Sequence, residues 1–302
     1  MCTAVGKYIK GMGWVIAKNR DQDYVSDISF LDKKHPKVGE VLALYDHDTG
    51  YSEGMNYAGL VVITTSLTPN LADETDKEDG KLIDKALTMS KPEDAAKFLI
   101  SKKLTGFIFI ASPEKFILVE AARTNDGEGE YHSKMRIVPK TETVVRTNHG
   151  VEFPWAGFQY GIDEKQDLWR KSSELRKEQA EKAIKKADNP IDLLDALASK
   201  MNNDLQMNLF RIEKKPRQMR TIFQWALIPA RDIAYVRPIQ CKLELKVSRD
   251  KIDIEVLENE TIRKTFDGKV RHLSKIEVTK NNKEIKAFQK EEFLGFKAFI
   301  TS

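Results

Sequence analysis

Cysteine is nearly absent from this chain of 302 residues, which contains only Cys2 and Cys241. Two cysteines cannot form a disulfide framework, and their scarcity predicts a protein of the reducing cytoplasm. Residues 239–245 alternate between apolar and polar side chains, which predicts a strand that holds Cys241 as a buried structural thiol. Cys2 is left as the one cysteine that is a candidate nucleophile.

Long apolar runs and targeting segments are also missing. No apolar run of about 18 residues occurs, so the sequence predicts no transmembrane helix and no membrane partner. The N-terminus lacks the basic segment, apolar core and cleavage site of a signal peptide. The 50 basic and 46 acidic residues give a net charge of +4, so the surface is nearly balanced. This excess is too small to indicate a nucleic-acid partner.

Several common kinds of site lack their signatures. The five histidines have no ligand spacing, and the loop at residues 46–50 fails the EF-hand pattern, so it is interpreted as a turn and no metal is expected. Neither a GxSxG elbow nor a GxxxxGK[ST] loop is present, and no cofactor is expected. The basic stretch 165–186 contains only one aromatic residue, Trp169, unlike a single-strand nucleic-acid binder.

What the sequence does have is a small residue directly after the initiator methionine. Aminopeptidases remove Met1 when the next side chain is small, and the mature chain then begins with Cys2. A thiol and a free α-amine, whose ordinary pKa is near 8, then belong to the same residue. The alternative is that Cys2 is an ordinary residue near a disordered terminus.

A predicted hairpin places charged groups beside this terminus. Residues 3–9 and 14–17 are expected strands, and the segment Gly11-Met12-Gly13 supplies turn residues that tolerate positive φ. A turn centred on Met12 pairs residues whose numbers sum to about 24, so Cys2 lies opposite position 22. Three charged residues are then within reach of Cys2: Arg20, Asp21 and Asp23.

The rest of the chain predicts blocks of strands and helices. Further strands are expected at residues 40–45, 57–65, 106–111, 116–121, 135–138 and 143–145, and helices at 76–89, 95–103, 164–187 and 190–200. Beyond residue 205 the pattern is almost entirely of strands, at 205–212, 220–227, 234–236, 240–247, 252–257, 261–266, 275–278 and 293–300. Such blocks favour antiparallel sheets with segregated helices, an α+β architecture.

Five motifs, in order and with compatible spacing, resemble one enzyme group. They are Met1-Cys2-Thr3, KNRD at 18–21, GMNYAGL at 54–60, TNHG at 147–150, and SSELR at 172–176, which opens a helix. The chain resembles N-terminal-nucleophile (Ntn) amidases from Cys2 to about Pro238. The likeness is strongest to bile-salt hydrolases, penicillin V acylases and the peptidases related to acyl-coenzyme A:6-aminopenicillanate acyltransferase, whose later part residues 220–223 also resemble.

This resemblance implies a fold and a mechanism. The fold is an αββα sandwich of two antiparallel sheets between helical layers. Cys2 is expected to attack an amide carbonyl while its own α-amine handles the proton. The resemblance assigns Asp21 to holding that amine, Asn148 to donating to the oxyanion, and Arg176 to supporting the nucleophile's electrostatics.

The chain departs from the group's pattern at two places. Lys18 stands where bile-salt hydrolases have arginine, and Arg20 follows two residues later, so either is a candidate supporting cation. The group's second oxyanion asparagine corresponds to Thr65 or Ser66. Trp155 lies in an aromatic stretch, residues 153–160, that is interpreted either as an acyl pocket or as core packing.

We therefore expect a cysteine hydrolase that cleaves a linear carbon–nitrogen amide bond of an acylated small molecule or peptide. An acyltransferase that uses the same site is the first alternative, and a non-catalytic protein that binds an acidic partner through its basic helix is the second. Residues 1–302 are expected to form one domain in which 241–302 extend the sheets, and a homo-oligomer is left open.

Overall fold

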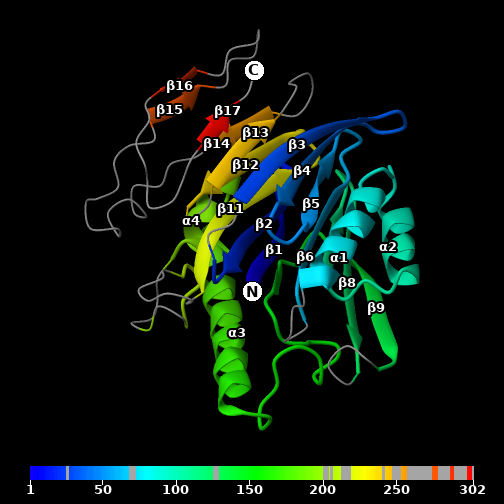
Figure 1. Cartoon of the computed structure of the whole chain (residues 1–302), viewed down its shortest axis with the longest axis vertical. Helices are drawn as coiled ribbons and strands as arrows, with labels where there is room; N and C mark the ends of the chain where they lie inside the picture. Colours follow the sequence, from blue (N-terminus) through cyan, green and yellow to red (C-terminus); the bar gives the residue numbers. More distant parts are fainter. Residues whose placement is uncertain are drawn as a thin grey trace.

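The computed structural model describes residues 1–24, 27–67, 73–124, 129–199, 204, 207–211 and 219–239, together with five short strands between 242 and 300. The elements form two large sheets and two pairs of helices (Figure 1). Among the described residues, no helix is long and apolar enough to cross a membrane.

The first sheet has six strands in the order β10-β1-β2-β11-β12-β14. Their bounds are β1 Cys2–Ile9, β2 Gly13–Gln22, β10 Val144–Arg146, β11 Arg220–Ile228, β12 Ile233–Pro238 and β14 Asp253–Val256. The second sheet has nine strands in the order β17-β13-β3-β4-β5-β6-β7-β8-β9. Their bounds are β3 Asp27–His35, β4 Gly39–Asp46, β5 Ser52–Asn56, β6 Val61–Thr65, β7 Gly106–Ala111, β8 Phe116–Arg123, β9 Tyr131–Val138, β13 Lys242–Lys246 and β17 Ala298–Ile300. Strands β15 Ser274–Glu277 and β16 Lys286–Phe288 form a separate pair.

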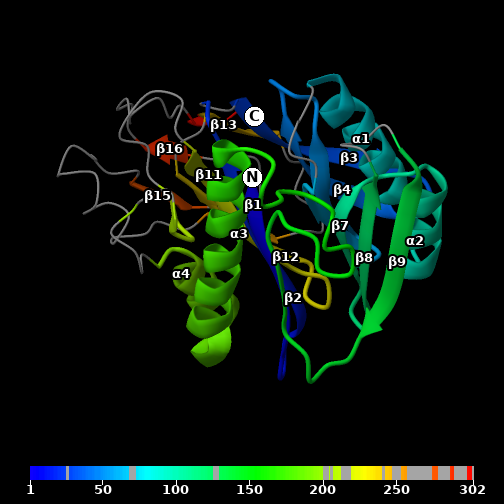
Figure 2. The same cartoon turned by 90° about the horizontal axis from the view of Figure 1, so that it is seen from below.

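Helices cover the outer face of each sheet. Their bounds are α1 Asp73–Ala86, α2 Pro92–Ser101, α3 Glu164–Ala183 and α4 Pro190–Leu197, with the 3-10 turn η2 at Ile184–Lys186. One hydrophobic cluster joins α1 and α2 to the second sheet, another joins α3, η2 and α4 to the first sheet, and a third lies between the sheets. Figure 2 shows the two helix pairs on opposite sides of the strands. The order of layers is therefore αββα, and the predicted fold class is confirmed.

Alternation along β1 and β2 decides which side chains face which layer. Ala4 belongs to the cluster between the sheets, whereas Val5 belongs to the cluster under α3 and α4. Since strand side chains point to opposite faces in turn, Cys2 and Arg20 face the inner layer. Thr3 and Asp21 face the helices by the same rule.

The β1–β2 hairpin turns at a different residue from the one predicted. Ile9 pairs with Gly13 and Cys2 with Arg20, so paired residue numbers sum to 22 rather than about 24. The reason is a loop of residues 10–12 centred on Gly11, whose φ of 83° is left-handed. Asp21 consequently lies opposite Met1, one residue before the nucleophile.

Other strand predictions were wrong in part. Residues 57–59 form a turn and not a strand, because Gly59 donates to the Asn56 carbonyl at 2.9 Å, and β6 begins only at Val61. The expected strand at 205–212 is absent from the described residues 207–211. There, Leu209 N–H donates to Gln179 Oε1 at 3.2 Å, so a side chain takes the place of a neighbouring strand. Strands β3 and β5 were not predicted.

The strand-rich C-terminal part joins the edges of both sheets. Strand β13 pairs in parallel with β3 and with β17, and β14 pairs in parallel with β12. These pairings agree with an extension of the sheets, while the single-domain organisation stays a prediction. The expected strand at 261–266 and the environment of Cys241 lie outside the described residues.

Candidate active site

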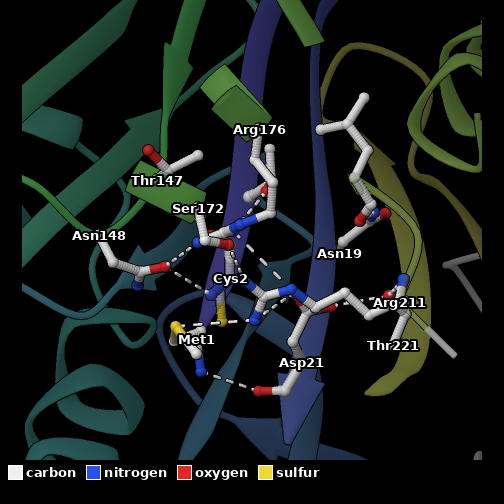
Figure 3. A network of polar contacts seen from close by, with 12 residues as sticks. Met1, Cys2, Asn19, Asp21, Thr147, Asn148, Ser172, Arg176, Arg211 and Thr221 are labelled. Atoms are coloured by element: carbon white, nitrogen blue, oxygen red, sulfur yellow. Dashed lines mark hydrogen bonds and ion pairs between the residues drawn. The ribbon is translucent and has the colours of Figure 1, made fainter. Parts of the chain in front are cut away.

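Met1 and Cys2 continue strand β1 at the end where it meets β2. The α-amine of Met1 donates to the carbonyl of Asp21 at 2.9 Å, and the N–H of Asp21 donates to the carbonyl of Met1 at 2.9 Å. Both N-terminal residues are buried, each with only 7% of its surface exposed. The structure therefore shows an ordered, enclosed N-terminus with Met1 in place, and not a frayed end (Figure 3).

Two distant residues hold the backbone of Cys2 on either side. The N–H of Cys2 donates to Asn148 Oδ1 at 3.2 Å, and Arg176 Nη1 donates to the carbonyl of Cys2 at 2.8 Å. Arg176 Nη2 also donates to Asn148 Oδ1 at 2.8 Å, so this one oxygen accepts from both Cys2 and Arg176 (Figure 3). Asn148 follows β10, which pairs with β1, and Arg176 projects from the buried side of α3. The predicted site residues Cys2, Asn148 and Arg176 are thus brought together.

The orientation of Asn148 is fixed from several directions. Its Nδ2 donates to the carbonyl of Ser66 at 2.9 Å, and its backbone N–H donates to Ser173 Oγ at 2.8 Å. Thr65 Oγ1 donates to the carbonyl of Thr147 at 2.9 Å, which holds the same segment. Thr65 and Ser66 therefore lie beside Asn148, and their predicted role as a second oxyanion donor stays a prediction.

Asp21 lies on the helix side of the sheet, in a buried group of charges. Its Oδ1 accepts from Thr221 Oγ1 at 2.8 Å. Its Oδ2 has no hydrogen-bond partner among the described residues, although Arg211 Nη1 is 3.8 Å away and Arg176 Nη1 is 4.0 Å away. One oxygen of this carboxylate is therefore anchored and the other is available to a donor.

Arg211 is the site residue that sequence reasoning missed. Its side chain is 1% exposed, its Nη2 donates to Ser172 Oγ at 2.6 Å, and its Nη1 lies 3.6 Å from the sulfur of Met1. The arginine follows a buried segment, residues 207–210, that was interpreted as part of a strand. A cation at the end of an apolar run was the only signal that the sequence offered. Ser172 and Thr221 belonged to recognised motifs but had no predicted role.

Burial and like charges shift the ionisation of this group. Burial lowers the pKa of the Met1 α-amine from its ordinary value of 8.0, and the neighbouring arginines add to the decrease, while Cys2 and Asp21 oppose it. Burial, reinforced by Arg211, lowers the pKa of Arg176 to about 9. Burial also lowers the pKa of Arg211. The α-amine of Met1 is therefore biased toward its neutral form.

Lys18 and Arg20 lie on the inner face of β2, each paired with a buried carboxylate. Lys18 Nζ is 2.6 Å from Glu53 Oε2, and Arg20 Nη2 is 2.6 Å from Asp46 Oδ2. Burial alone lowers the pKa of Arg20, but Asp46 and Glu53 outweigh it and raise this pKa well above its usual value. Arg20 pairs with Cys2 across the hairpin, whereas Lys18 pairs with Ala4, so Arg20 is the nearer of these two cations to the nucleophile.

Trp155 lies apart from this group. Its ring centroid is 5.5 Å from those of both Phe153 and His132, and it packs against the core between the sheets. Its predicted role in an acyl pocket stays a prediction. The loop before it is fixed by buried Glu120, whose carboxylate accepts from three successive N–H groups, those of residues 151–153.

Two sheets between helical layers, with a cysteine next to the N-terminus at the end of an interior strand of the first sheet, define a protein of the Ntn-hydrolase type. More particularly, the chain belongs to the acyl-coenzyme A:6-aminopenicillanic acid acyl-transferase family, whose model matches residues 10–238. The predicted family resemblance is thereby confirmed. Membership places the chain among acyl-transferring or amide-hydrolysing enzymes.

The chain is also similar to solved structures of two variants of the conjugated bile acid hydrolase from Clostridium perfringens. One is 13% identical, with a TM-score of 0.45, and the match covers 79% of this chain and 89% of the other. The second is 14% identical, with a TM-score of 0.43 and coverages of 78% and 89%. No curated protein sequence matches the chain.

Proposed function

We propose that the mature chain begins at Cys2 and is an amidase that cleaves a linear carbon–nitrogen bond of an acylated small molecule or peptide. One observation supports this most: the nitrogen of Cys2 lies 3.2 Å from Asn148 Oδ1, inside a buried group of Asp21, Arg176 and Arg211. Removal of Met1 turns that nitrogen into a free α-amine that is already enclosed by polar side chains.

The proposed reaction uses Cys2 alone for nucleophile and base. The α-amine takes the thiol proton, and the thiolate attacks the carbonyl carbon of the amide. The resulting ammonium then gives its proton to the leaving nitrogen, so the C–N bond breaks and a thioester remains. Water, deprotonated by the same amine, attacks the thioester carbonyl and releases the acid with the thiol restored.

The surrounding residues have distinct roles in this proposal. Asp21 Oδ2, which has no other hydrogen-bond partner among the described residues, accepts from the ammonium form of Cys2 and stabilises it. Arg176 fixes the Cys2 carbonyl and the amide of Asn148. Asn148 has a second side-chain N–H beyond the one that Ser66 accepts, and this N–H serves the oxyanion. Arg20, opposite Cys2, supports the thiolate electrostatically.

Acyl transfer is the second candidate, because the matched family is described as an acyl-transferase. Both reactions pass through the same thioester and differ in which nucleophile releases the acyl group. Adding a primary amine to a reaction in progress separates them. A hydrolase continues to form mainly free acid, whereas a transferase forms mainly the new amide at millimolar amine.

The proposed nucleophile is tested by mass and by labelling. We expect intact-mass measurement to show loss of Met1, and one equivalent of iodoacetamide at neutral pH to modify Cys2 faster than Cys241. Cys2→Ala, which also permits removal of Met1, is the matched control and should retain only the slow label. Retention of Met1 in all of the protein, or equal labelling of both cysteines, contradicts the proposal.

A further inference from the structure

A row of four side chains crosses the inner face of the second sheet, next to the segment that carries Asn148. Its members are paired directly across four neighbouring strands, and they are Thr65 of β6, Phe107 of β7, Glu120 of β8 and Lys134 of β9. Side chains of directly paired residues point to the same face of a sheet. Because Phe107 belongs to the cluster between the sheets, the whole row faces that layer. We call these four residues the cross-strand row.

The first two members of the row contact the chain just before Asn148. Thr65 Oγ1 donates to the carbonyl of Thr147 at 2.9 Å. The guanidinium carbon of Arg146 lies 5.3 Å from the centroid of the Phe107 ring, a distance at which a cation is attracted to the ring. Residues 146 and 147 are thereby held against the second sheet, although β10, to which Arg146 belongs, is a strand of the first sheet.

The other two members contact the chain just after Asn148. Glu120 Oε1 accepts from the N–H groups of residues 151 and 153, at 2.9 and 3.0 Å, and Oε2 accepts from the N–H of residue 152 at 2.8 Å. Lys134 Nζ forms an ion pair with the side chain of Glu152. The row thus follows the chain from residue 146 to residue 153, with Asn148 between its contacts.

Glu120 is the member of the row whose presence packing alone does not explain. Its neighbours on the same face of β8 are the apolar core residues Leu118 and Ala122. Glu120 is nevertheless only 1% exposed, and burial of a carboxylate is costly unless hydrogen bonds or cations compensate it. Among the described residues, all of its hydrogen bonds come from the N–H groups of residues 151–153. Such bonds to a charged acceptor are about twice as strong as neutral ones, so the carboxylate acts mainly on this loop.

Hydrogen bonds within the loop connect the residues bound by the carboxylate to Asn148. The N–H of Ala156 donates to the carbonyl of Phe153 at 2.8 Å, and the N–H of Gly150 donates to the carbonyl of Ala156 at 2.9 Å. The N–H of Phe158 then donates to the carbonyl of Asn148 at 3.3 Å. A displacement of the carboxylate-bound segment is therefore transmitted to Asn148.

From these contacts, and resting on the proposed function, we propose that the cross-strand row positions Asn148 for the oxyanion and that Glu120 is its anchor. Glu120 is a positioning residue, which acts through the loop and not on the substrate. Cys2 belongs to the first sheet, so the row makes the second sheet set the distance between the nucleophile and the oxyanion donor. A donor that lies about 1 Å out of place lowers a rate about 100-fold, so this distance matters to the chemical step.

The first test measures whether Glu120 holds Asn148, and it needs no substrate. Glu120→Gln keeps the length of the side chain but replaces one acceptor oxygen by an NH2 donor. In hydrogen–deuterium exchange resolved to single amides, we expect residues 151–153 and Asn148 to exchange at least about tenfold faster, as for the loss of a hydrogen bond to a charged acceptor. Glu120→Asp, which keeps the charge but is shorter by one methylene, should lie between the wild type and Glu120→Gln, and it takes the place of Glu120→Gln if that variant does not fold. Faster exchange at residues 151–153 alone, with Asn148 as in the wild type, overturns the proposal.

Asn56→Ala is the matched control. Asn56 is also fully buried and also holds a turn by three hydrogen bonds, from the N–H of Leu60 and to the carbonyls of Leu87 and Met89. None of these partners belongs to the loop that follows Asn148. We therefore expect this variant to lose stability while the exchange of Asn148 stays as in the wild type.

The second test measures the chemical step in the processed protein. The substrates are the 7-amido-4-methylcoumarin amides of acetic, phenylacetic and octanoic acid. An oxyanion donor acts in the transition state, so we expect Glu120→Gln to lower kcat about 10- to 100-fold with KM changed less than about threefold. Asn56→Ala should leave kcat close to the wild-type value. A rise in KM with kcat unchanged, or an equal loss of kcat in the two variants, overturns the positioning role.

The two tests separate this inference from the amidase proposal. If the wild-type protein cleaves none of the three amides and Cys2 is unreactive in the labelling experiment, the proposed function fails. The exchange measurement then still decides whether Glu120 holds Asn148 in place. Faster exchange of residues 151–153 and Asn148 together supports the anchor, and exchange of Asn148 at the wild-type rate contradicts it.

Discussion

Asp21 is the residue whose charge the proposed mechanism needs most directly. In Asp21→Asn, Oδ1 can still accept from Thr221, but no carboxylate remains to stabilise the Cys2 ammonium. We expect kcat to fall by about 100-fold or more, the usual contribution of a proton-transfer group. Thr221→Val is the control, since it removes the hydrogen bond and keeps the charge. Equal losses of kcat in both variants, measured well below each Tm, would mean that Asp21 acts only through packing.

His149, directly after Asn148, gives the site a predictable dependence on pH. Burial, helped by the positive charge of Arg170, lowers the pKa of His149 from 6.5 to about 4. The unfolded chain therefore binds a proton at His149 near pH 6.5, whereas the folded chain binds it only near pH 4. The free energy of unfolding therefore falls as the pH falls through this window. The decrease is up to about 3 kcal/mol in the free energy of unfolding.

Urea unfolding at pH 7.5, 6 and 5 measures this effect. His149→Gln is the matched variant, because its side-chain amide can still form a hydrogen bond with Ser173 Oγ, which lies 2.9 Å from His149 Nδ1. We expect the stability of the variant to decline less between pH 7.5 and pH 5 than that of the wild type. Parallel curves for the two proteins would assign the acid sensitivity to other groups.

At the scale of elements, the sequence was informative where side chains alternate cleanly. The hairpin of β1 and β2 and the helices were predicted because apolar residues recur with a period of two or of about 3.6. The register was two positions off, because Gly11 and Gly13 both permit a left-handed turn and the pattern cannot choose its centre. The predicted register placed Asp21 diagonally across from Cys2, whereas the observed register places it opposite Met1.

Elements whose buried positions are polar were not predicted from the periodicity of apolar residues. Strand β5 was not predicted, because its buried positions include Ser52 and Glu53, and the buried Glu53 is stabilised by an ion pair with Lys18 on another strand. Arg211 was missed for a related reason, since its partners lie 39 positions away at Ser172 and at the N-terminus. Long-range charge pairing leaves no periodic trace in a sequence.

Helix α3 illustrates how one element serves two purposes. Its outer face carries ion pairs along the helix, Arg170 with Glu174, Lys177 with Glu181, and Lys182 with Glu178. Its inner face carries fully buried Arg176 to the nucleophile. Three of its basic residues are thus paired with carboxylates one turn away, and the alternative of a protein that binds an acidic partner stays a prediction.

The contact between β1 and the opposite sheet leads to a stability prediction. A Cβ at Gly6 would lie 2.4 Å from Phe116 Cε1, and Phe116 is itself enclosed by Trp14 and Phe109. We expect Gly6→Ala to lower the free energy of unfolding by about 3 kcal/mol, the upper part of the range for overpacking. Gly11→Ala, at a left-handed turn with open space around it, should cost only about 1 kcal/mol. Denaturant unfolding compares the two, and equal losses would indicate that the layers can separate locally.

At the scale of the whole molecule, the candidate site is assembled from segments that are remote along the chain. Strands β1 and β2 supply Cys2 and Asp21, the segment after β10 supplies Asn148, α3 supplies Arg176, and residues 207–211 supply Arg211. Asn19 of β2 links this strand to residues 207–211 and to α4, because its Nδ2 donates to the carbonyls of Leu209 and Leu197, each at 2.9 Å. The site therefore depends on the αββα layers as a unit.

The C-terminal strands are the part of the molecule whose contribution is still to be tested. All residues of the candidate site lie before position 239, and the family match ends at 238. A chain that ends at residue 239 loses β13 beside β3 and β14 beside β12, which exposes an edge on each sheet. Exposed edges promote association between chains.

We therefore expect the shortened chain to keep one rapidly labelled Cys2 and a cooperative unfolding transition, with a lower Tm and a stronger tendency to aggregate. Light scattering during heating and iodoacetamide labelling of the soluble fraction provide the two measurements. The full-length chain is the control. Loss of Cys2 reactivity together with loss of cooperative unfolding would contradict the prediction, because it would make residues 241–302 part of the structural unit that holds the site and not an extension of its sheets.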